Sequence, residues 1–462
     1  MDDKKRHLTE KEILEITKRA MHKTFGDFGL DESFQSKNKG GLGAFVEEHI
    51  FGYKPNNDDN PDFIDAGIEL KVTPVKKNLD GSLSSKERLV LNMINYKSEA
   101  LTTFKTSSFY KKNKRLLMWF YLYSLGVHPS NFEFIDYDLF EFENSLQYKV
   151  IERDWHIIHE KIVTGKAHEI SESDTEFLAA CTKGADSKVL TEQYGSSIKA
   201  KPRAYSFKAS FMTYLYRNLI HNIAPYSPLV SEDEWMKNPL EEIYKEKMSA
   251  YKGMTQAQLC RKFGVSSKAK QLNFILAQKM LGISGRKKAT TEMEVAGIIF
   301  RTITIDKNGR PTEAMPFKPF EFEELINTPW DESSIREDFV DLKLMIFVFE
   351  EIDGVISFDR LHFWNAPNSV VDGAVKKMHE KCAEMVRNGT AFYVDSKGKI
   401  KDRFPKECRN SNGVCHVRDH ARVGSDHFDL KVPDKETGIT SYTKQSFWFN
   451  KDFVLKILEE KI

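Results

Sequence analysis

Residues 61–74 of the chain read PDFIDAGIELKVTP, and the fold is decided here. Aliphatic side chains occupy every second position from residue 68 to residue 72: Ile68, Leu70 and Val72. Glu69 and Lys71 alternate with them, and a period of two is the spacing of a β-strand with one buried face. The stretch 66–75 is therefore predicted to form a short strand that carries Glu69 and Lys71 together on its other face.

Asp62, Glu69 and Lys71 have the spacing D-x6-E-x-K, which suits phosphodiester hydrolysis. Two carboxylates can hold Mg²⁺ against a scissile phosphate, because magnesium prefers oxygen ligands and keeps waters, one of which can attack. A lysine on the same strand face can orient that water and compensate the charge of the phosphate. The same spacing also occurs by chance in charged proteins, where Glu69 and Lys71 would only cover the exposed face of a strand.

The segments around this strand have patterns of their own. Upstream, glycines open the stretch GGLGAFVEEHIFG (40–52), and apolar residues then recur at helical spacing. Residues 8–25 are predicted to form an amphipathic helix, with Thr9 and Glu12 as a capping box. Downstream, RLLMWFYLYSL (115–125) is predicted to be a fully buried strand, and it is too short to span a bilayer.

The stretch KGGLGAFVE (39–47) and the strand that follows closely resemble MutH and its relatives, the GATC-cutting type II restriction endonucleases of the Sau-three-A type. The family patterns K-G-x-x-G-x-x-x-E and D-x6-E-L-K are matched by Lys39, Gly40, Gly43, Glu47, Asp62, Glu69, Leu70 and Lys71. The resemblance implies that Asp62 and Glu69 are metal ligands and that Lys71 is the catalytic lysine. It also implies Glu47 as a further active-site carboxylate.

The downstream sequence resembles the two-domain restriction enzymes, so the resemblance covers nearly the whole chain. It implies an α/β protein with two tandem restriction-endonuclease-fold domains, each a mixed sheet flanked by helices, arranged as a pseudo-dimer. The protein is expected to cut double-stranded DNA at GATC with Mg²⁺ and to engage two copies of that site. A DNA-induced dimer is left open.

In this family a segment after the nuclease core reads DNA. The matching stretches here are CTKGADSKVLTE (181–192) and KPRAYSFK (201–208). Lys183 and Arg203 are expected in the groove, where long cationic side chains reach base acceptors or phosphates. Ser206 is also expected to contact DNA, and it stands where MutH has a tyrosine that is associated with sensing adenine methylation. The alternative for each basic residue is a solvated loop.

The order of elements restarts after a polar, proline-bearing stretch. At an offset of 230 residues, Ala-Gly-Ile at 66–68 falls on Ala-Gly-Ile at 296–298. RAYSFKASF (203–211) also matches QSFWFNKDF (445–453) in its aromatic positions. Two matches in the same order indicate a duplicated fold. The predicted division is a catalytic domain at 1–222, a linker at 223–240 and a second domain at 241–462.

The second domain is expected to be catalytically dead. At the same offset, the four active-site positions become Ala277, Glu292, Ile299 and Arg301. Isoleucine cannot bind a metal, and the high pKa of arginine prevents it from acting as a base. The family resemblance implies a different task for this domain, as an allosteric DNA-binding module. Its expected DNA-binding residues are Arg418, His420 and Gln445.

Composition sets limits on the class of protein. The 462 residues include 40% hydrophobic and 30% charged side chains with a formal charge of +1, which fits a globular protein of two domains. Overall charge gives no argument for DNA binding, so any DNA surface must come from clustering. Five scattered cysteines and the lack of an apolar leader predict a cytoplasmic protein with free thiols.

Weaker patterns point to other features. The basic runs KKNKR (111–115) and RKK (286–288) could track a DNA backbone, although such runs are more often solvated turns. A zinc site is disfavoured because there is only one C-x6-C and one H-x3-H pair, among Cys408, Cys415, His416 and His420. Neither a Walker loop nor a dinucleotide fingerprint is present, so no nucleotide cofactor is expected.

Two rival functions remain. A MutH-like mismatch-repair nickase shares the chemistry, but the fused second domain argues against it. A non-catalytic GATC-binding regulator is of a different class, and the intact set of Glu47, Asp62, Glu69 and Lys71 argues against that.

Overall fold

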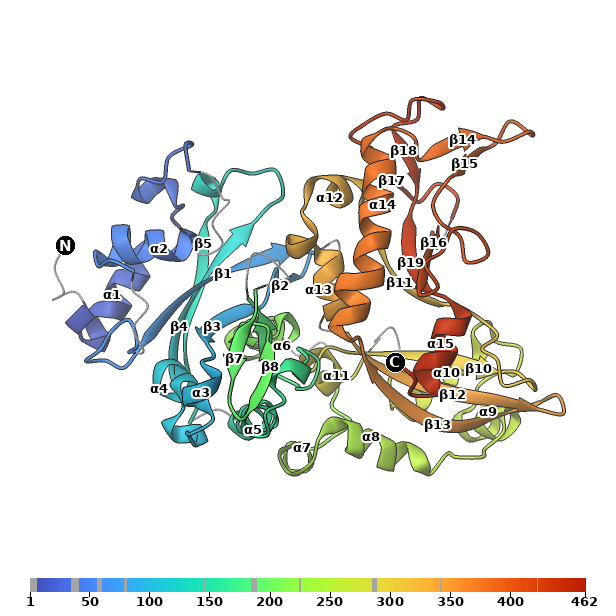
Figure 1. The fold of residues 1–462 in the computed structure, drawn as a ribbon, viewed down its shortest axis with the longest axis horizontal. Helices are drawn as coiled ribbons and strands as arrows, with labels where there is room; N and C mark the ends of the chain where they lie inside the picture. Colours follow the sequence, from blue (N-terminus) through green and yellow to red (C-terminus); the bar gives the residue numbers. More distant parts are fainter. Residues whose placement is uncertain are drawn as a thin grey trace. The chain divides into compact units, whose positions relative to one another are not determined.

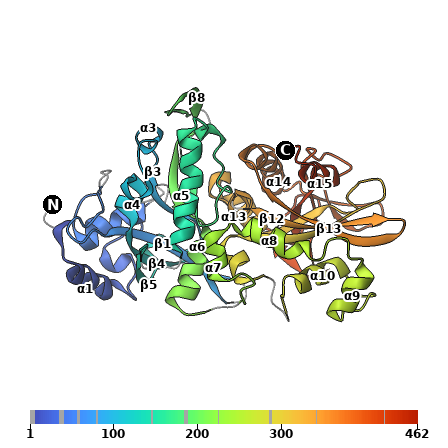
Figure 2. The ribbon, with the colours of Figure 1, turned by 90° about the horizontal axis from the view of Figure 1, so that it is seen from below.

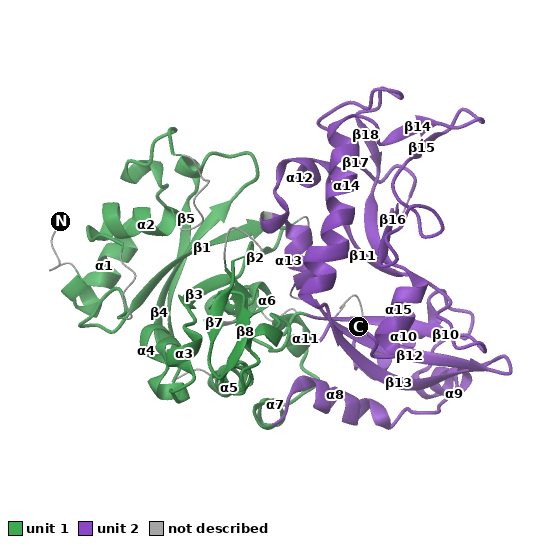
Figure 3. Ribbon diagram, in the orientation of Figure 1, with its two compact units in different colours: residues 1–237, 291–297 green, residues 238–290, 298–462 purple. Residues whose placement is uncertain are grey.

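The structure is a computed structural model of the chain (Figure 1). It describes residues 6–34, 41–55, 60–78, 81–143, 147–183, 189–223, 226–284, 289–340, 342–421 and 423–462. Lys39, Gly40, residues 184–188 of the predicted DNA-reading segment and the RKK run lie outside these described residues. The chain divides into two compact units: Met1–Lys237 with Thr291–Gly297, and Asn238–Thr290 with Ile298–Ile462 (Figure 3).

The first unit contains a four-stranded sheet in the order β2-β1-β4-β5. Its strands are Leu83–Ser85 (β2), Glu69–Lys77 (β1), Arg115–Tyr123 (β4) and Phe134–Glu141 (β5). β1 runs parallel to β4, with Glu69 paired to Leu116, whereas β2 and β5 are antiparallel to their neighbours. The two strands predicted at 66–75 and 115–125 therefore form the parallel centre of this sheet.

Helices cover both faces of the sheet, because successive side chains of β4 point to opposite sides. Trp119 packs in one core with α1 (Glu10–Ala20) and α2 (Gly41–Phe45). Met118 packs in another core with α5 (Tyr148–Val163). Figure 2 shows α1 and α5 in different layers of the first unit. β4 is buried on both faces, as its unbroken apolar run requires.

The first helix is shorter than the 8–25 predicted from its pattern. Thr9 and Glu12 form the expected capping box, but the helix ends at Ala20. The chain then turns towards the sheet, where the backbone N–H of His22 donates to the carbonyl of Phe134 at 2.7 Å. Because this N–H group is used by the tertiary hydrogen bond, it cannot form the hydrogen bond of a further helical turn, and the helix ends.

A second sheet of the first unit is antiparallel, in the order β3-β9-β6. Its strands are Leu89–Met93 (β3), Arg203–Phe207 (β9) and Leu178–Thr182 (β6), and a hairpin pairs Thr191–Gln193 (β7) with Ser196–Ala200 (β8). The remaining α-helices of this unit are Tyr96–Glu99 (α3), Ser108–Asn113 (α4), Ala209–Tyr214 (α6), Glu232–Lys237 (α7) and Thr291–Val295 (α11). The central strand β9 is buried along its whole length.

The second unit, like the first, contains two main sheets. Both have three strands, in the orders β10-β12-β13 and β11-β19-β16. Their strands are Ile298–Ile305 (β10), Lys343–Ile352 (β12), Val355–Asn365 (β13), Met315–Phe320 (β11), Gln445–Phe449 (β19) and Cys415–Asp419 (β16). Two short hairpins pair Phe392–Val394 (β14) with Ile400–Asp402 (β15), and His427–Asp429 (β17) with Ser441–Thr443 (β18). The α-helices are Leu240–Ser249 (α8), Gln256–Phe263 (α9), Leu272–Met280 (α10), Phe322–Asn327 (α12), Ser334–Val340 (α13), Lys376–Arg387 (α14) and Lys451–Leu458 (α15).

The two units share one order of elements, which confirms the predicted tandem α/β fold. In each, two parallel strands (β1 and β4, or β10 and β12) are followed by an antiparallel third strand (β5 or β13). In each, a strand near the C-terminal end of the unit is the centre of an antiparallel sheet, β9 or β19. Gly67 and Gly297, which precede the first strands, both have left-handed backbones, with φ of +64° and +67°. None of the helices in the described ranges is long and apolar enough to cross a membrane.

Candidate active site

Asp62 and Glu69 meet because residues 62–69 form a tight turn before β1. Phe63 and Ile68 bond to each other through both backbone groups, at 2.9 and 3.2 Å, and Gly67 supplies the left-handed residue that closes the turn. The backbone N–H of Asp62 donates to Oε2 of Glu69 at 3.1 Å, and that of Leu70 donates to Oδ2 of Asp62 at 2.9 Å. The two carboxylates are thus fixed by backbone donors at the start of the strand.

Lys71 lies on the same face of β1 as Glu69, as the alternation predicts. Its Nζ donates to Oε1 of Glu69 at 2.7 Å and to the carbonyl of Leu91, on β3, at 3.3 Å. The Glu69 side chain is 3% exposed and that of Lys71 17% exposed. The ammonium is therefore held between the first sheet and the second, with one side open.

Lys112 is a further cation of the site that the sequence did not single out. It lies on α4, in the basic run interpreted above as a backbone-tracking or solvated stretch, and its Nζ is 3.9 Å from Oε1 of Glu69. Its side chain is only 12% exposed. The sole signal in the sequence was the run KKNKR, which does not show which of its residues would turn inward.

Glu47 approaches the site from the helix before the turn. It lies on Val46–Phe51 (η3), a π-helical continuation of α2 that ends at Gly52, whose φ is +79°. Its carbonyl accepts the backbone N–H of Tyr53 at 3.0 Å. Tyr53 is 2% exposed, and its buried hydroxyl has no hydrogen-bond partner in the described part of the chain. No pattern in the sequence pointed to this tyrosine.

Burial dominates the electrostatics of the carboxyl groups. It raises the pKa of Asp62 to about 8, with the neighbouring Glu69 adding to the effect. It also raises the pKa of Glu47 to about 7, although the nearby Lys71 opposes the shift. Burial alone would lower the pKa of Lys71, but the attraction of Glu69 and Asp62 outweighs it and raises that pKa. The site is a cluster of carboxyl groups that can exchange protons for a cation, next to a lysine that stays charged.

The residues expected to read DNA in the first unit occupy different surroundings. Lys183 is half-buried at the end of β6, next to residues outside the described chain. Arg203 is 2% exposed, and its guanidinium donates to the carbonyls of Ala180 and Ile170. Ser206 is fully buried at the centre of its sheet. The groove contacts expected of Arg203 and Ser206 stay predictions, and they require exposure that this structure does not have.

The positions that replace the active-site residues in the second half have other partners. Ala277 and Ile299 have no polar side chain, and Glu292 accepts the backbone N–H of Val230 at 2.6 Å. Arg301 donates to the carbonyls of Phe300 at 3.0 Å and Pro316 at 3.2 Å. Burial lowers the pKa of Arg301 to about 10. The guanidinium is therefore bound by backbone oxygens rather than by a carboxylate.

Two of the three DNA-contact residues expected in the second unit are exposed. Arg418 lies at the end of β16 with its guanidinium 4.7 Å above the ring of Trp448. His420 is also exposed, and its Nδ1 is 3.0 Å from Oγ of Ser446. Gln445, in contrast, is fully buried and donates to Asp419 at 2.6 Å. The structure brings Arg418 and His420 together around Trp448, and it keeps Gln445 inside.

Comparison with known proteins gives two kinds of match. The family model described as "DNA mismatch repair enzyme MutH" matches residues 51–154, which include Asp62, Glu69, Lys71 and Lys112. The type II restriction enzyme Sau3AI of Staphylococcus aureus is 35% identical over 98% of this chain and 99% of its own length. The DNA mismatch repair protein MutH of Vibrio vulnificus (strain YJ016) is 26% identical over 46% of this chain and 96% of its own length. The MutH of Shewanella woodyi is 27% identical over 38% of this chain and 74% of its own length.

Proposed function

The chain belongs to the family of MutH-like type II restriction endonucleases that includes Sau3AI, and it is a site-specific deoxyribonuclease; we propose that it cleaves double-stranded DNA at GATC by Mg²⁺-dependent hydrolysis. The observation that supports a hydrolytic site most strongly is the pairing of Lys71 Nζ with Glu69 at 2.7 Å beside Asp62. The proposed catalytic residues are Glu47, Asp62, Glu69 and Lys71, and all four lie in the first unit.

The donor set fits magnesium, and Asp62 and Glu69 would hold the ion. Within the described residues, no group of three or more His, Cys, Asp and Glu side chains is arranged as a complete metal site. Magnesium does not require one, because proteins usually bind it through one or two carboxylates together with water and substrate phosphates. When bound, the ion would polarise the phosphate and lower the pKa of a water molecule.

The chain's own cations would act on the phosphate and on the attacking water. Lys71 is close enough to the carboxylates to orient a water molecule and to offset negative charge that develops on the phosphate. Lys112, whose Nζ lies 3.9 Å from the same oxygen of Glu69 that Lys71 contacts, would add a second positive charge to the site. Glu47, with its pKa near neutrality, would accept or return a proton at the edge of the site.

A plasmid-cleavage assay with variants tests this assignment. Asp62→Ala and Glu69→Ala should abolish cleavage with Mg²⁺ while DNA binding persists, because both residues are proposed to hold the metal. The matched control is Asp65→Ala, in the same turn, whose side chain is 60% exposed and, among the described residues, pairs with His7 at the surface. Substantial cutting by either of the first two variants would overturn the assignment.

The form of the products distinguishes the rival functions. Discrete double-strand fragments support the restriction enzyme, and sequencing their ends tests GATC as the recognised site. Nicked circles would support a mismatch-repair nickase instead. Shifted but uncut DNA would support a regulator without catalysis.

We further propose that the second unit binds a second GATC site without cutting it. The replacements at Ile299 and Arg301 remove the metal-binding and lysine chemistry, while Arg418 and His420 stay exposed on the sheet that corresponds to the DNA-reading sheet of the first unit. Binding at this second site would favour cleavage by the first unit, which is a coupling free energy between two sites.

A further inference from the structure

The second unit has a basic hairpin that the first unit lacks. It consists of β14 and β15, which pair antiparallel between α14 and β16. In Figure 1 it projects from the body of the second unit, at the upper right. In the first unit the corresponding connection, residues 164–177 between α5 and β6, is fully described and contains only a short 3-10 helix, Ala167–Glu169.

The two faces of the hairpin differ in chemistry, because side chains alternate along each strand. Val394 pairs with Ile400 on one face, and these apolar side chains are 48% and 38% exposed. Tyr393 pairs with Lys401 on the other face. Arg403, directly after β15, places its guanidinium 4.8 Å from the ring of Tyr393, on this same face. Lys399 directly precedes β15, and with Lys401, Tyr393 and Arg403 it forms a basic and aromatic strip.

The lysines of the strip and its turn form no ion pair with an acidic residue among the residues that the structure describes. Lys397, Lys399 and Lys401 are exposed, and none forms an ion pair within the described chain. Hydrogen bonds from the backbone lower the pKa of nearby Asp395, and the charges of Lys401 and Lys399 contribute to lowering it. Neither Asp395 nor Asp402 forms an ion pair with these lysines in the described chain. Asp395 accepts the backbone N–H groups of Lys397 and Lys399, both at 2.9 Å, and Asp402 pairs with Lys406 at 2.7 Å. The lysine charges are therefore available to an anion from outside.

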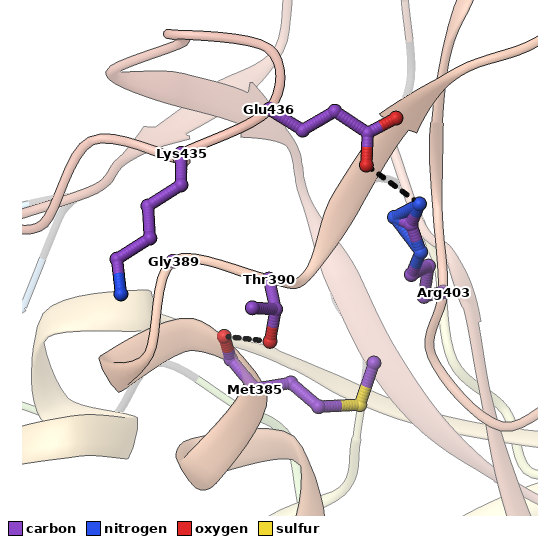
Figure 4. Close-up of a pocket in the computed structure, with 6 residues that line it drawn as sticks. All are labelled: Met385, Gly389, Thr390, Arg403, Lys435 and Glu436. Carbon is purple, nitrogen blue, oxygen red and sulfur yellow. Dashed lines mark hydrogen bonds and ion pairs between the residues drawn. The ribbon is translucent and has the colours of Figure 1, made fainter.

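A pocket at the base of the hairpin adds one more available cation. It has a volume of about 590 Å³ and is lined by Met385, Gly389, Thr390, Arg403, Lys435 and Glu436. Figure 4 shows Arg403 joined to Glu436, a pair 2.7 Å apart, so that this charge is already compensated. Lys435 lies on another side of the pocket without an ion pair in the described structure. The positive charge thus extends from the hairpin tip to its base.

We propose that this hairpin binds the sugar–phosphate backbone of duplex DNA. Lys401 lies on β15 and Lys399 directly precedes this strand; residues two apart in an extended chain are about 6.7 Å apart, so these two side chains can reach separate phosphates, and Lys397 adds a third charge from the turn. Contacts of this kind carry no sequence information but position a protein on its site. The proposal rests on DNA binding by the second unit, and it assigns a new surface, distinct from Arg418 and His420, to hold the backbone.

The test is the salt dependence of DNA binding by the full chain. Lys397→Gln, Lys399→Gln and Lys401→Gln are combined in one variant, and a second variant combines Lys262→Gln, Lys268→Gln and Lys270→Gln, which are exposed in the same unit. Binding to a GATC duplex and to a scrambled duplex is measured without Mg²⁺ at several salt concentrations. Both variants lose the same charge, so only position distinguishes them.

The hairpin variant should bind both duplexes roughly tenfold more weakly, and its slope of log affinity against log salt should fall by about 0.9 for each lost phosphate contact. The control variant should keep the slope of the parent protein. Equal losses in both variants, or an unchanged slope in the hairpin variant, would overturn the proposal. If the parent protein bound neither duplex, the proposed function would fail as well, whereas normal parent binding with an unchanged variant would refute the hairpin alone.

Discussion

Asp62 and Glu47 are held where water solvates their charge poorly, and this affects how the site would load a metal. Burial raises the pKa of Asp62 to about 8 and that of Glu47 to about 7. Both carboxyl groups therefore hold part or all of a proton at neutral pH. A metal ligand must be deprotonated, so binding of Mg²⁺ by Asp62, one of the two proposed ligands, has to release the proton of that carboxyl group.

The apparent affinity for Mg²⁺ is accordingly expected to rise from pH 6 to about pH 8 and then to level off, with protons released on binding at pH 7. Calorimetric titration in buffers of different ionisation enthalpy measures both quantities. Asp62→Asn, which cannot lose a proton, should bind more weakly and release fewer protons, whereas Asp65→Asn should behave as the parent chain does. Affinity that did not depend on pH between 6 and 8 would contradict this prediction.

Lys71 is expected to contribute chemistry as well as charge pairing. Replacing it by alanine should lower the cleavage rate by about 10² to 10⁴-fold, the usual contribution of a proton-transferring or charge-compensating group. Single-turnover cleavage of a GATC duplex measures the rate, and Lys111→Ala on α4, whose parent side chain is exposed, is the control. A loss smaller than about threefold would leave Lys71 only a structural role.

The sequence predicted part of this site because of a local rule. Glu69 and Lys71 are two residues apart in a strand, so their shared face follows from the period of two. Asp62 follows from the short turn that Gly67 closes. Lys112 reaches the site through the packing of α4. Tyr53 lies beside the turn, with its ring 5.6 Å from that of Phe63, and no local spacing predicts such contacts.

At the scale of elements, the aromatic residues predicted the repeat because they are side chains that the strands bury in the core of each unit. The aromatics that coincide in RAYSFKASF and QSFWFNKDF include Tyr205 and Phe447, which are central and buried in β9 and β19. Arg203, in contrast, was expected in the DNA groove because it lies in the stretch that matches the DNA-reading segment of the family. It is buried because the carbonyls of Ala180 and Ile170 accept its donors, and the sequence does not show that such acceptors come near.

Helix α14 carries a histidine that should make the second unit acid-sensitive. His379 is 3% exposed, neither ring nitrogen has a partner in the described chain, and its ring packs 5.1 Å from that of Trp330. Burial lowers its pKa from 6.5 to about 4. His379 is therefore protonated at a higher pH in the unfolded chain than in the folded protein. Its effect on the free energy of unfolding is absent above pH 6.5, and the protein loses stability as the pH falls from 6.5 towards 4.

His379→Phe should remove this loss. At pH 5 the penalty in the parent chain is roughly 2 kcal/mol, and the variant should recover it relative to its own stability at pH 7.5. Urea unfolding at the two pH values measures the difference, with His156→Phe, an exposed histidine on α5, as the control. An equal acid-induced loss in His379→Phe and the parent chain would contradict the prediction.

At the scale of the whole molecule, the duplication was predictable but the path of the chain was not. Residues Thr291–Gly297 return to pack with the first unit, where Val295 joins its core and Glu294 pairs with Arg217 at 2.9 Å. A repeat found by comparing two halves of a sequence assigns each residue to the half in which it lies. It cannot show a segment of the second half that completes the first unit.

The proposed division of labour between a cutting unit and a binding unit makes a kinetic prediction. A plasmid with two GATC sites should be cut faster than a plasmid with one, and an uncleavable GATC duplex added in trans should stimulate cutting of the one-site plasmid at low occupancy. Coupling energies of this kind are usually about 1 to 3 kcal/mol, so stimulation of about five- to 150-fold is the expected range. Initial rates on the two plasmids, with and without the duplex, measure it.

Arg418→Ala should reduce this stimulation, because Arg418 is exposed beside Trp448 on the unit that is proposed to bind DNA without cutting it. It should leave Mg²⁺ affinity unchanged, because the proposed metal ligands lie in the first unit. Arg409→Ala, which removes another exposed arginine from the same unit, is the matched control. If the second unit only stabilised the first, one-site and two-site plasmids would be cut at equal rates and added duplex would have no effect at any concentration. That outcome would exclude allosteric activation, because no differential binding energy would then connect the two sites.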